Sequence, residues 1–203
     1  IENFKALLGD GSRYGVKISY KIQNKPRGLP EAFVLGKSFI NNDNVALILG
    51  DNFFYGQSLA KKLEKSSNHK KGATIFLKEV ATPKNYGVAK ITKNKIEKII
   101  EKPKKFVSKN AITGLYFFDK NVSSYASKLK PSKRGELEIT DLIKKSKFGI
   151  FRYLSGIKFP YATTITKSGL LSKKNLYSKS LLKLYGDLTF KLNFSAVRCI
   201  GDL

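Results

Sequence analysis

The segment Val45-Ala-Leu-Ile-Leu-Gly-Asp-Asn-Phe-Phe-Tyr-Gly56 is the part of the sequence around which the other motifs are arranged. Its first five residues are all apolar, and such a short unbroken run predicts a strand buried on both faces of a parallel sheet. Gly50, Asp51 and Asn52 then end the strand. Because open α/β sheets bind ligands beyond the carboxyl ends of their strands, Asp51 is a candidate ligand-binding residue. Gly-Asp-Asn is also ordinary turn sequence, so a simple strand-to-loop turn is the alternative.

The 203 residues include 39 Lys and Arg against 15 Asp and Glu, which gives a formal net charge of +24. Such an excess attracts anions, and the candidates are nucleic acid, acidic membrane surfaces, nucleotides and sugar phosphates. A general bias toward lysine could supply the same charge without any binding role. The hydrophobic content of 41% is enough for one domain with a substantial core.

The only cysteine, Cys199, cannot form a disulfide within the chain, so we expect a reducing compartment and place the protein in the cytoplasm. No apolar run approaches the roughly 20 residues that a membrane-spanning helix needs, and no membrane partner is expected. The chain lacks methionine, even at position 1, so we expect it to be an internal piece of a longer product.

Strands and helices alternate between residues 17 and 80. Apolar residues at every second position predict strands, whereas Pro30 suits the first turn of a helix. This alternation favours a Rossmann-like α/β sheet that is mostly parallel, with helices on both faces. The predicted elements are, in order, a strand over 17–23, a helix over 30–40, a strand over 45–49, a helix over 58–65 and a strand over 73–80.

The pattern changes to short strands after residue 80. Lys93-Asn-Lys95 joins two of them and predicts an added antiparallel hairpin. Apolar periodicity is lost from residue 146 onward, so we divide the chain into a domain over 1–145 and a basic tail over 146–203 without assigned structure. The other predicted elements are a helix over 4–8 with a glycine cap, strands over 87–91, 96–100 and 111–118, and helices over 121–128 and 138–147.

Two groups of polar residues stand at the ends of these elements. Gln23 ends a strand, and Gly28 precedes a helix, where glycine lets a ligand approach the backbone closely. Hairpin pairing would bring Tyr86-Gly87 next to Glu101-Lys102, and a carboxylate beside a cation suits a sugar phosphate. An ordinary loop and a solvated ion pair are the plainer alternatives.

The segment Arg134-Gly-Glu-Leu-Glu-Ile-Thr-Asp141 places three acids behind an arginine at the start of a helix. Acids are expected in a first helical turn for dipole reasons alone, and Thr140 and Asp141 could simply face solvent. The sequence contains no Walker A loop, no zinc-like Cys/His spacing and no nucleophile elbow.

Seven motifs stand in the order typical of one enzyme family. From about residue 1 to residue 142, the chain resembles the glucose-1-phosphate thymidylyltransferases, which are sugar nucleotidyltransferases. The motifs are Leu8-Gly-Asp-Gly-Ser12, Gly28-Leu29 with Ala32-Phe33, Leu49-Gly-Asp-Asn52 with Phe54-Tyr-Gly56, Tyr86-Gly-Val88, Glu101-Lys-Pro103, Thr113-Gly-Leu-Tyr-Phe117 and Arg134-Gly-Glu-Leu-Glu-Ile-Thr-Asp141.

This resemblance implies a transfer reaction between dTTP and glucose 1-phosphate that forms dTDP-glucose, a precursor of dTDP-rhamnose, and pyrophosphate. It implies Mg²⁺ as cofactor, with Asp51 as its ligand, and a homo-oligomeric full-length form. Charge on the reacting phosphates would be offset by cations, so positioning and electrostatics would dominate catalysis. The implied site residues are Asp51, Lys102 and Arg134 for catalysis, Gln23, Gly28 and Asp51 for the nucleotide, and Tyr86, Gly87, Glu101, Lys102, Ile112 and Tyr116 for the sugar phosphate.

The chain departs from the pattern of this family in two places. The glycine-rich nucleotide loop and the first βα unit of the family would lie before Ile1. The second magnesium aspartate of the family, in a Trp-Leu-Asp-Thr-Gly-Thr motif, has no counterpart in a chain without tryptophan. We therefore expect this chain alone to be catalytically inactive and poorly soluble.

Two alternative functions stay open from the sequence. The charge of +24 would suit a basic nucleic-acid-binding protein, but no recognisable binding motif accompanies it, and we expect no nucleic-acid partner. A related sugar nucleotidyltransferase that uses another base or another sugar is the second alternative.

Overall fold

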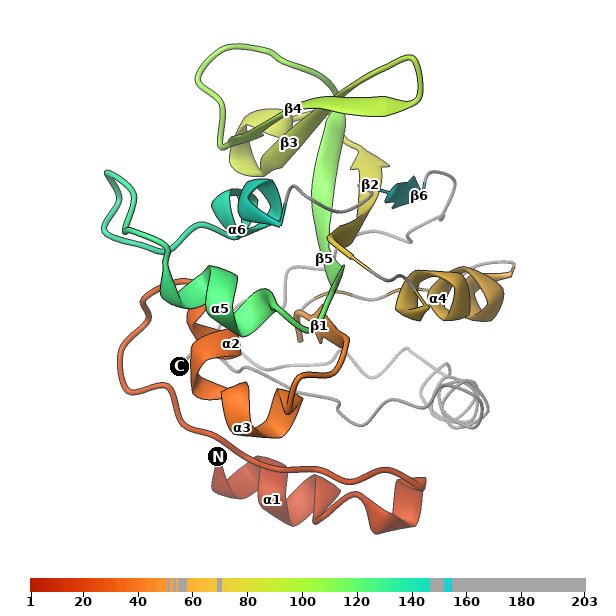
Figure 1. Cartoon of the computed structure of the whole chain (residues 1–203), viewed down its shortest axis with the longest axis vertical. Helices are drawn as coiled ribbons and strands as arrows, with labels where there is room; N and C mark the ends of the chain where they lie inside the picture. Colours follow the sequence, from red (N-terminus) through yellow and green to blue (C-terminus); the bar gives the residue numbers. More distant parts are fainter. Residues whose placement is uncertain (51, 53, 55–57, 69–70, 147–151, 155–203) are drawn as a thin grey trace, which may run out of the picture.

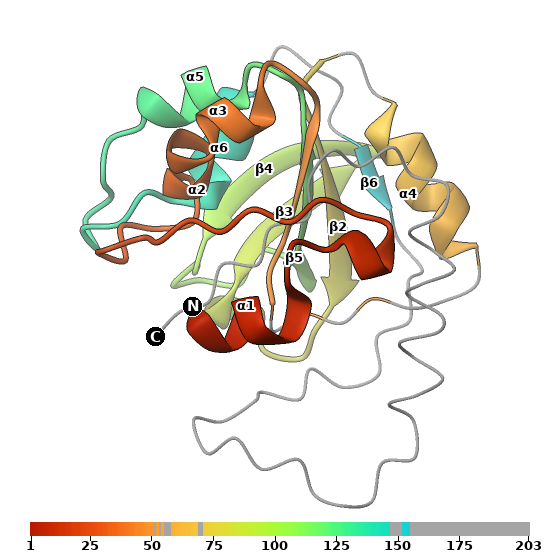
Figure 2. The same ribbon diagram turned by 90° about the horizontal axis from the view of Figure 1, so that it is seen from below.

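A computed structural model of the chain describes residues 1–50, 52, 54, 58–68, 71–146 and 152–154. A sheet lies between helices on both of its faces, as Figures 1 and 2 show. The helix α4 (Leu59–Ser67) covers one face, and the opposite face carries α2 (Glu31–Leu35), α3 (Lys37–Ile40), α5 (Val122–Ser127) and α6 (Ile139–Lys145). The layered α/β architecture expected from the sequence is therefore confirmed.

The sheet is organised around β5 (Asn110–Phe118). It pairs in antiparallel fashion with β1 (Val45–Ile48), β2 (Ala73–Glu79) and β3 (Gly87–Thr92). The strand β4 (Lys95–Glu101) pairs with β3, also antiparallel, and only β6 (Arg152–Leu154) runs parallel to its neighbour, β2.

The prediction of a mostly parallel sheet is therefore wrong. Since β1 and β2 both run antiparallel to β5, they share one direction, as the strand–helix–strand order implied. They do not pair with each other, because the later and strongly apolar β5 occupies the position between them. Sequence order revealed the direction of these strands but not this insertion.

The predicted strand over residues 17–23 is a second correction. Their burial alternates as expected only as far as Tyr20, because Ile22 is 59% exposed, and no described strand pairs with their backbone. The helix α1 (Glu2–Leu8) lies alongside them instead, and the Tyr20 hydroxyl donates a hydrogen bond to the Gly9 carbonyl oxygen at 2.6 Å. Alternation alone does not make a strand, because a strand also needs a hydrogen-bonded neighbour.

The predicted hairpin is confirmed. Lys93 and Asn94 connect β3 to β4 with φ angles of 48° and 59°, the left-handed values of a tight hairpin turn. The register of the two strands sets Gly87 opposite Glu101. The predicted glycine cap of α1 is also present, because the Gly9 N–H bonds to the Lys5 carbonyl oxygen at 2.8 Å. Two 3₁₀ turns, Ser12–Tyr14 and Pro83–Asn85, complete the regular structure.

Alternate side chains of β5 enter two separate cores. Tyr116 and Phe118 face the helices α2, α5 and α6, and the Phe118 ring meets that of Phe33 edge-on at 5.2 Å. Leu115 and Phe117 pack with the α4 side. Burying side chains of this size stabilises the fold by about 1.5–3 kcal/mol each. No helix among the described residues is both long and apolar enough to cross a bilayer.

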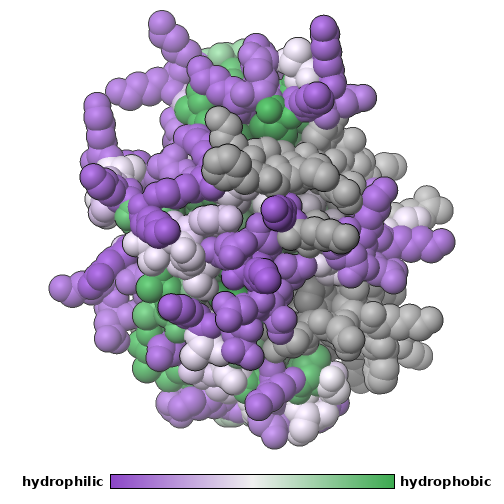
Figure 3. Space-filling view, in the orientation of Figure 1, coloured by the Kyte–Doolittle hydropathy of each residue, from purple (hydrophilic) through white to green (hydrophobic). Residues whose placement is uncertain are grey.

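We expected every residue of β1 to be buried, but only Leu47 is. The other three residues of β1 are partly exposed. The strand pairs with β5 on one edge, and no described strand covers its other edge. Figure 3 shows that hydrophilic side chains cover most of the face on view, with smaller hydrophobic patches between them.

Candidate functional site

The open end of the β3–β4 hairpin brings several of the predicted residues together. A Cβ atom added at Gly87 would lie 3.2 Å from Glu101 Oε2 and 3.5 Å from Ile112 Cδ1. It would lie only 2.8 Å from Thr140 Cγ2, on α6. Three strands and one helix thus pack closely around Gly87, and a larger side chain there would force its neighbours to move.

Tyr86 and Lys102 flank this point on the surface. The Lys102 N–H bonds to the Tyr86 carbonyl oxygen at 3.0 Å, which extends the hairpin pairing by one residue on each strand. Both side chains are exposed. The hairpin therefore brings Tyr86-Gly87 to the same end as Glu101-Lys102, as the sequence predicted.

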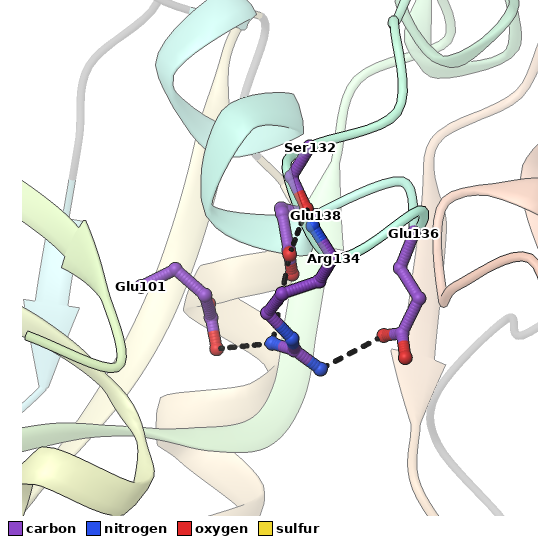
Figure 4. Close-up of polar contacts among 5 residues, drawn as sticks. All are labelled: Glu101, Ser132, Arg134, Glu136 and Glu138. Atoms are coloured by element: carbon purple, nitrogen blue, oxygen red, sulfur yellow. Dashed lines mark hydrogen bonds and ion pairs between the residues drawn. The ribbon is translucent and has the colours of Figure 1, made fainter.

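Arg134 joins this hairpin to the loop before α6 (Figure 4). Its guanidinium nitrogens lie 3.0 Å from Glu136 Oε2, 3.5 Å from Glu138 Oε1 and 3.9 Å from Glu101 Oε1. The Ser132 hydroxyl donates a further hydrogen bond of 2.7 Å to Glu138. The Glu138 side chain is only 9% exposed, whereas that of Arg134 is 40% exposed. Arg134 thus compensates a buried carboxylate while remaining accessible to a ligand.

Glu101 has a raised pKa in this setting. Burial of the carboxyl is the largest cause, and repulsion by the Glu138 carboxylate adds to it. The Thr140 hydroxyl, Lys102 and Arg134 act in the opposite direction but do not cancel the rise in pKa. Burial and the Glu138 charge thus disfavour the charged form of Glu101 more than these three groups favour it.

The other predicted group, Gln23 and Gly28, lies before α2. The Gln23 amide nitrogen donates a hydrogen bond to Glu31 Oε2 at 2.5 Å. Gly28 has a φ of +102°, and an added Cβ would lie 2.2 Å from the Leu137 carbonyl oxygen. The Leu137 N–H in turn bonds to the Arg27 carbonyl oxygen at 2.8 Å. The Gly28 loop therefore rests on the same segment, 134–138, that carries Arg134.

Asp51, the predicted magnesium ligand, lies outside the described residues. Its neighbour Asn52 accepts a hydrogen bond from the Gly114 N–H through Oδ1 at 3.0 Å, so the chain leaving β1 is attached to β5. Within the described part of the chain, no group of three or more His, Cys, Asp or Glu side chains could hold a metal ion. The role of Asp51 stays a prediction.

Ile112 and Tyr116 occupy the same face of β5, four residues apart. Both are buried, and the Tyr116 ring stacks with that of Phe118 at 6.4 Å. Ile112 reaches the space beside Gly87, whereas Tyr116 belongs to the same core further along the strand. A ligand could reach only a small part of Tyr116.

Sequence reasoning missed two contacts at this site. Thr140 is fully buried rather than facing solvent. Its position three residues before the buried Ile143 was the available signal, because such residues share one side of a helix. Gln23 and Glu31 are eight residues apart in the sequence, and their contact depends on how the loop between them folds. No sequence pattern predicts it.

Comparisons with known proteins identify the family of the chain. The family described as "Nucleotidyl transferase" matches residues 2–147. A glucose-1-phosphate thymidylyltransferase of Neisseria meningitidis is 50% identical over 141 residues, which cover 69% of this chain and 49% of that protein. One from Xanthomonas campestris is 47% identical over 140 residues, covering 68% of this chain and 48% of that protein. The chain thus spans about half the length of the curated relatives it matches.

A solved structure is similar as well. A crystal structure from Bacillus anthracis, assigned as a glucose-1-phosphate thymidylyltransferase and in complex with a sucrose, has a TM-score of 0.70 and 35% identity. The match covers 97% of this chain and 74% of that chain. These comparisons give no support to a nucleic-acid-binding protein. The sequence motifs, the layered α/β fold and the matched residues together show that this chain belongs to the nucleotidyl transferase family.

Proposed function

We propose that this chain is part of a glucose-1-phosphate thymidylyltransferase and forms the sugar-phosphate side of its active site. The observation that carries the proposal is the close convergence of Glu101, Ile112 and Thr140 at Gly87. Arg134 lies 3.9 Å from Glu101, and Lys102 follows Glu101 in the chain. A half-buried carboxylate beside exposed cations is complementary to a ligand with hydroxyl groups at one end and a phosphate at the other.

The reaction would use this complementarity to position the nucleophile. A phosphate oxygen of glucose 1-phosphate attacks the α-phosphorus of dTTP, and the bond from that phosphorus to the oxygen bridging to the β-phosphate breaks, so that pyrophosphate leaves. Glu101 would accept hydrogen bonds from the sugar, while Lys102 and Arg134 would hold the attacking phosphate. Fixing the two reactants in this way removes a large entropic part of the barrier.

The proposed cofactor is Mg²⁺, and the only ligand that we assign to it from this chain is Asp51. Magnesium is commonly bound through one or two carboxylates together with waters and substrate phosphates, so a single aspartate at a strand end is chemically adequate. When bound, the ion would offset the charge that develops on the phosphates. The attachment of Asn52 to Gly114 supports this assignment, because it restrains the backbone next to Asp51.

The finer expectations from the sequence remain part of this proposal. They are dTTP and glucose 1-phosphate as substrates, dTDP-glucose as product for dTDP-rhamnose or another deoxysugar, a cytoplasmic location, and a homo-oligomeric full-length form. The names of the similar proteins support the substrates. A related enzyme with another base or sugar is the competing possibility, and direct comparison of ligands decides between them.

The proposal is tested by titrating the 203-residue chain with glucose 1-phosphate in a calorimeter or by NMR. We expect saturable binding that Glu101→Gln weakens about tenfold, the effect of one charge-assisted hydrogen bond. Glu97→Gln is the matched control, because Glu97 is on the same strand but 46% exposed and paired with Lys90. Equal affinities in all three proteins, or stronger binding of galactose 1-phosphate, would refute the assignment. Pyrophosphate release from dTTP and glucose 1-phosphate by this chain would overturn the expectation that it is inactive alone.

A further inference from the structure

Glu31 accepts a hydrogen bond from the side-chain amide of Gln23. Gln23 Nε2 donates to Glu31 Oε2 at 2.5 Å, and the Glu31 side chain is only 15% exposed. Its other oxygen lies 3.7 Å from Arg27 Nε, which is a long contact to an exposed side chain. The hydrogen bond to Gln23 is therefore the closer of the two contacts that Glu31 makes with side chains.

This contact determines which way the amide points. The oxygen and nitrogen ends of a glutamine amide are nearly the same size and can exchange places by rotation. A carboxylate can only accept hydrogen bonds, whereas the amide nitrogen can only donate them, so Glu31 must face Nε2. Gln23 Oε1 is thereby turned away from Glu31 and is the acceptor that a ligand would meet.

We propose that Glu31 is a positioning residue for base selection, which acts by fixing the orientation of the Gln23 amide. This inference rests on the proposed function together with the prediction, implied by the family resemblance, that Gln23 contacts the base of the nucleotide. Thymine and uracil carry a hydrogen on N3, whereas N3 of cytosine is an acceptor. The fixed Oε1 of Gln23 accepts the N3–H of thymine or uracil.

Cytosine is disfavoured in both orientations of the amide. With Gln23 oriented as in the structure, Oε1 and cytosine N3 would be two acceptors in contact. If the amide turned to offer Nε2 to cytosine, Oε1 would face the Glu31 carboxylate, which again brings two acceptors together. Selectivity of this kind arises from the unfavourable contact as much as from the favourable one.

The test compares the binding of dUTP and dCTP to the full chain by NMR titration. These two nucleotides differ only in the hydrogen-bonding groups at N3 and C4, so the contributions of phosphates and sugar cancel in the ratio of their affinities. We expect the chain to prefer dUTP and Glu31→Gln to reduce that preference about tenfold, because a second amide can face either end of Gln23. Glu31→Ala should act in the same direction and serves if Glu31→Gln does not fold.

Controls separate this inference from the proposed function. Arg27→Gln removes the distant cation but keeps the Gln23–Glu31 bond, so it should leave the preference unchanged. If both Glu31 variants keep the dUTP preference while Gln23→Ala binds nucleotides more weakly, the role of Glu31 is overturned, but the base site at Gln23 is not. If Gln23→Ala leaves nucleotide binding unchanged, the base site of the proposed function is wrong, and the role of Glu31 is overturned with it.

Discussion

The two halves of the candidate site are held in place in different ways. The proposed sugar-phosphate side stands on the β3–β4 hairpin, whose register sets Gly87 opposite Glu101, and Arg134 contacts it from the loop before α6. The predicted nucleotide side, around Gln23 and Gly28, has no strand pairing among the described residues, and Gln23 is hydrogen-bonded to Glu31. The first is fixed by local pairing, whereas the second depends on a segment more than a hundred residues away.

That distant segment joins the two halves. The Gly28 loop rests on the Leu137 backbone, and Arg134, three residues before Leu137, lies 3.9 Å from Glu101. A substitution at the contact between Gly28 and Leu137 should therefore affect both halves of the candidate site, whereas a substitution inside the hairpin should affect only the sugar-phosphate half.

The largest expected effect is that of Gly28→Ala. The new Cβ would lie 2.2 Å from the Leu137 carbonyl oxygen, at a φ of +102°. We expect a loss of about 3 kcal/mol in the free energy of unfolding, from overpacking against backbone together with strain in φ. Urea denaturation measures this loss. Gly135→Ala is the matched control, because Gly135 also has a positive φ but has no atom within 4 Å of an added Cβ.

The control should lose only about 1 kcal/mol, from backbone strain alone. Equal losses for the two variants would show that the contact between the Gly28 loop and Leu137 does not exist in solution. They would also remove the structural connection between the two halves of the site.

Gly87→Ala should affect the sugar side alone. Its Cβ would lie 2.8 Å from Thr140 Cγ2, an atom that can move slightly, so we expect a loss of about 1–2 kcal/mol in stability. Glucose 1-phosphate should bind at least tenfold more weakly, because the added methyl group would also lie 3.2 Å from Glu101 Oε2 and displace the carboxylate proposed to bind the sugar. Calorimetry measures both. The double variant with Thr140→Ser should recover stability but not binding, whereas recovery of both would contradict the proposed position of the sugar.

The difference between the two halves also explains what could be predicted from the sequence. The hairpin was predictable because its pairing is local: alternating strands with Lys93-Asn-Lys95 between them specify the turn. The exact pairing of Gly87 with Glu101 was not specified by the turn, because an irregularity between Lys90 and Ile91 shifts the register by one residue. Residues 17–23 show the same alternation in sequence but form no strand, because the sequence of a segment does not specify whether another strand will pair with it.

The mostly antiparallel pairing of the sheet could not be predicted for a related reason. The strand–helix–strand order correctly implied that β1 and β2 run in one direction. It carried no information on β5, which comes later in the chain and inserts between them. Likewise, the acids 136 and 138 were noticed as residues of a helix start, but their contacts with Arg134 depend on how the preceding loop folds.

The dependence of stability on pH should reveal the burial of Glu101. Its pKa is raised in the folded state from the model-peptide value of 4.5, mainly by burial, so the folded protein holds this proton more tightly than the unfolded chain does. The resulting contribution to stability is fully present below pH 4.5 and is lost as the pH rises through the folded-state pKa. We expect the free energy of unfolding to fall more steeply above pH 4.5 in the wild type than in Glu101→Gln. Parallel pH curves for the two proteins would contradict this burial.

The smallest expected effect separates the two causes of the raised pKa. Repulsion by Glu138 is the second cause after burial, so Glu138→Gln should lower the pKa of Glu101 without returning it to its ordinary value. Carbon-detected NMR titration of the Glu101 carboxyl measures this shift. Glu136→Gln is the control, because Glu136 also binds Arg134 but is not among the groups that shift the pKa of Glu101. If the two variants shift the pKa of Glu101 equally, the shift arises because Arg134 loses one of its partners and interacts more strongly with Glu101. The charge of Glu138 would then not act on Glu101 directly.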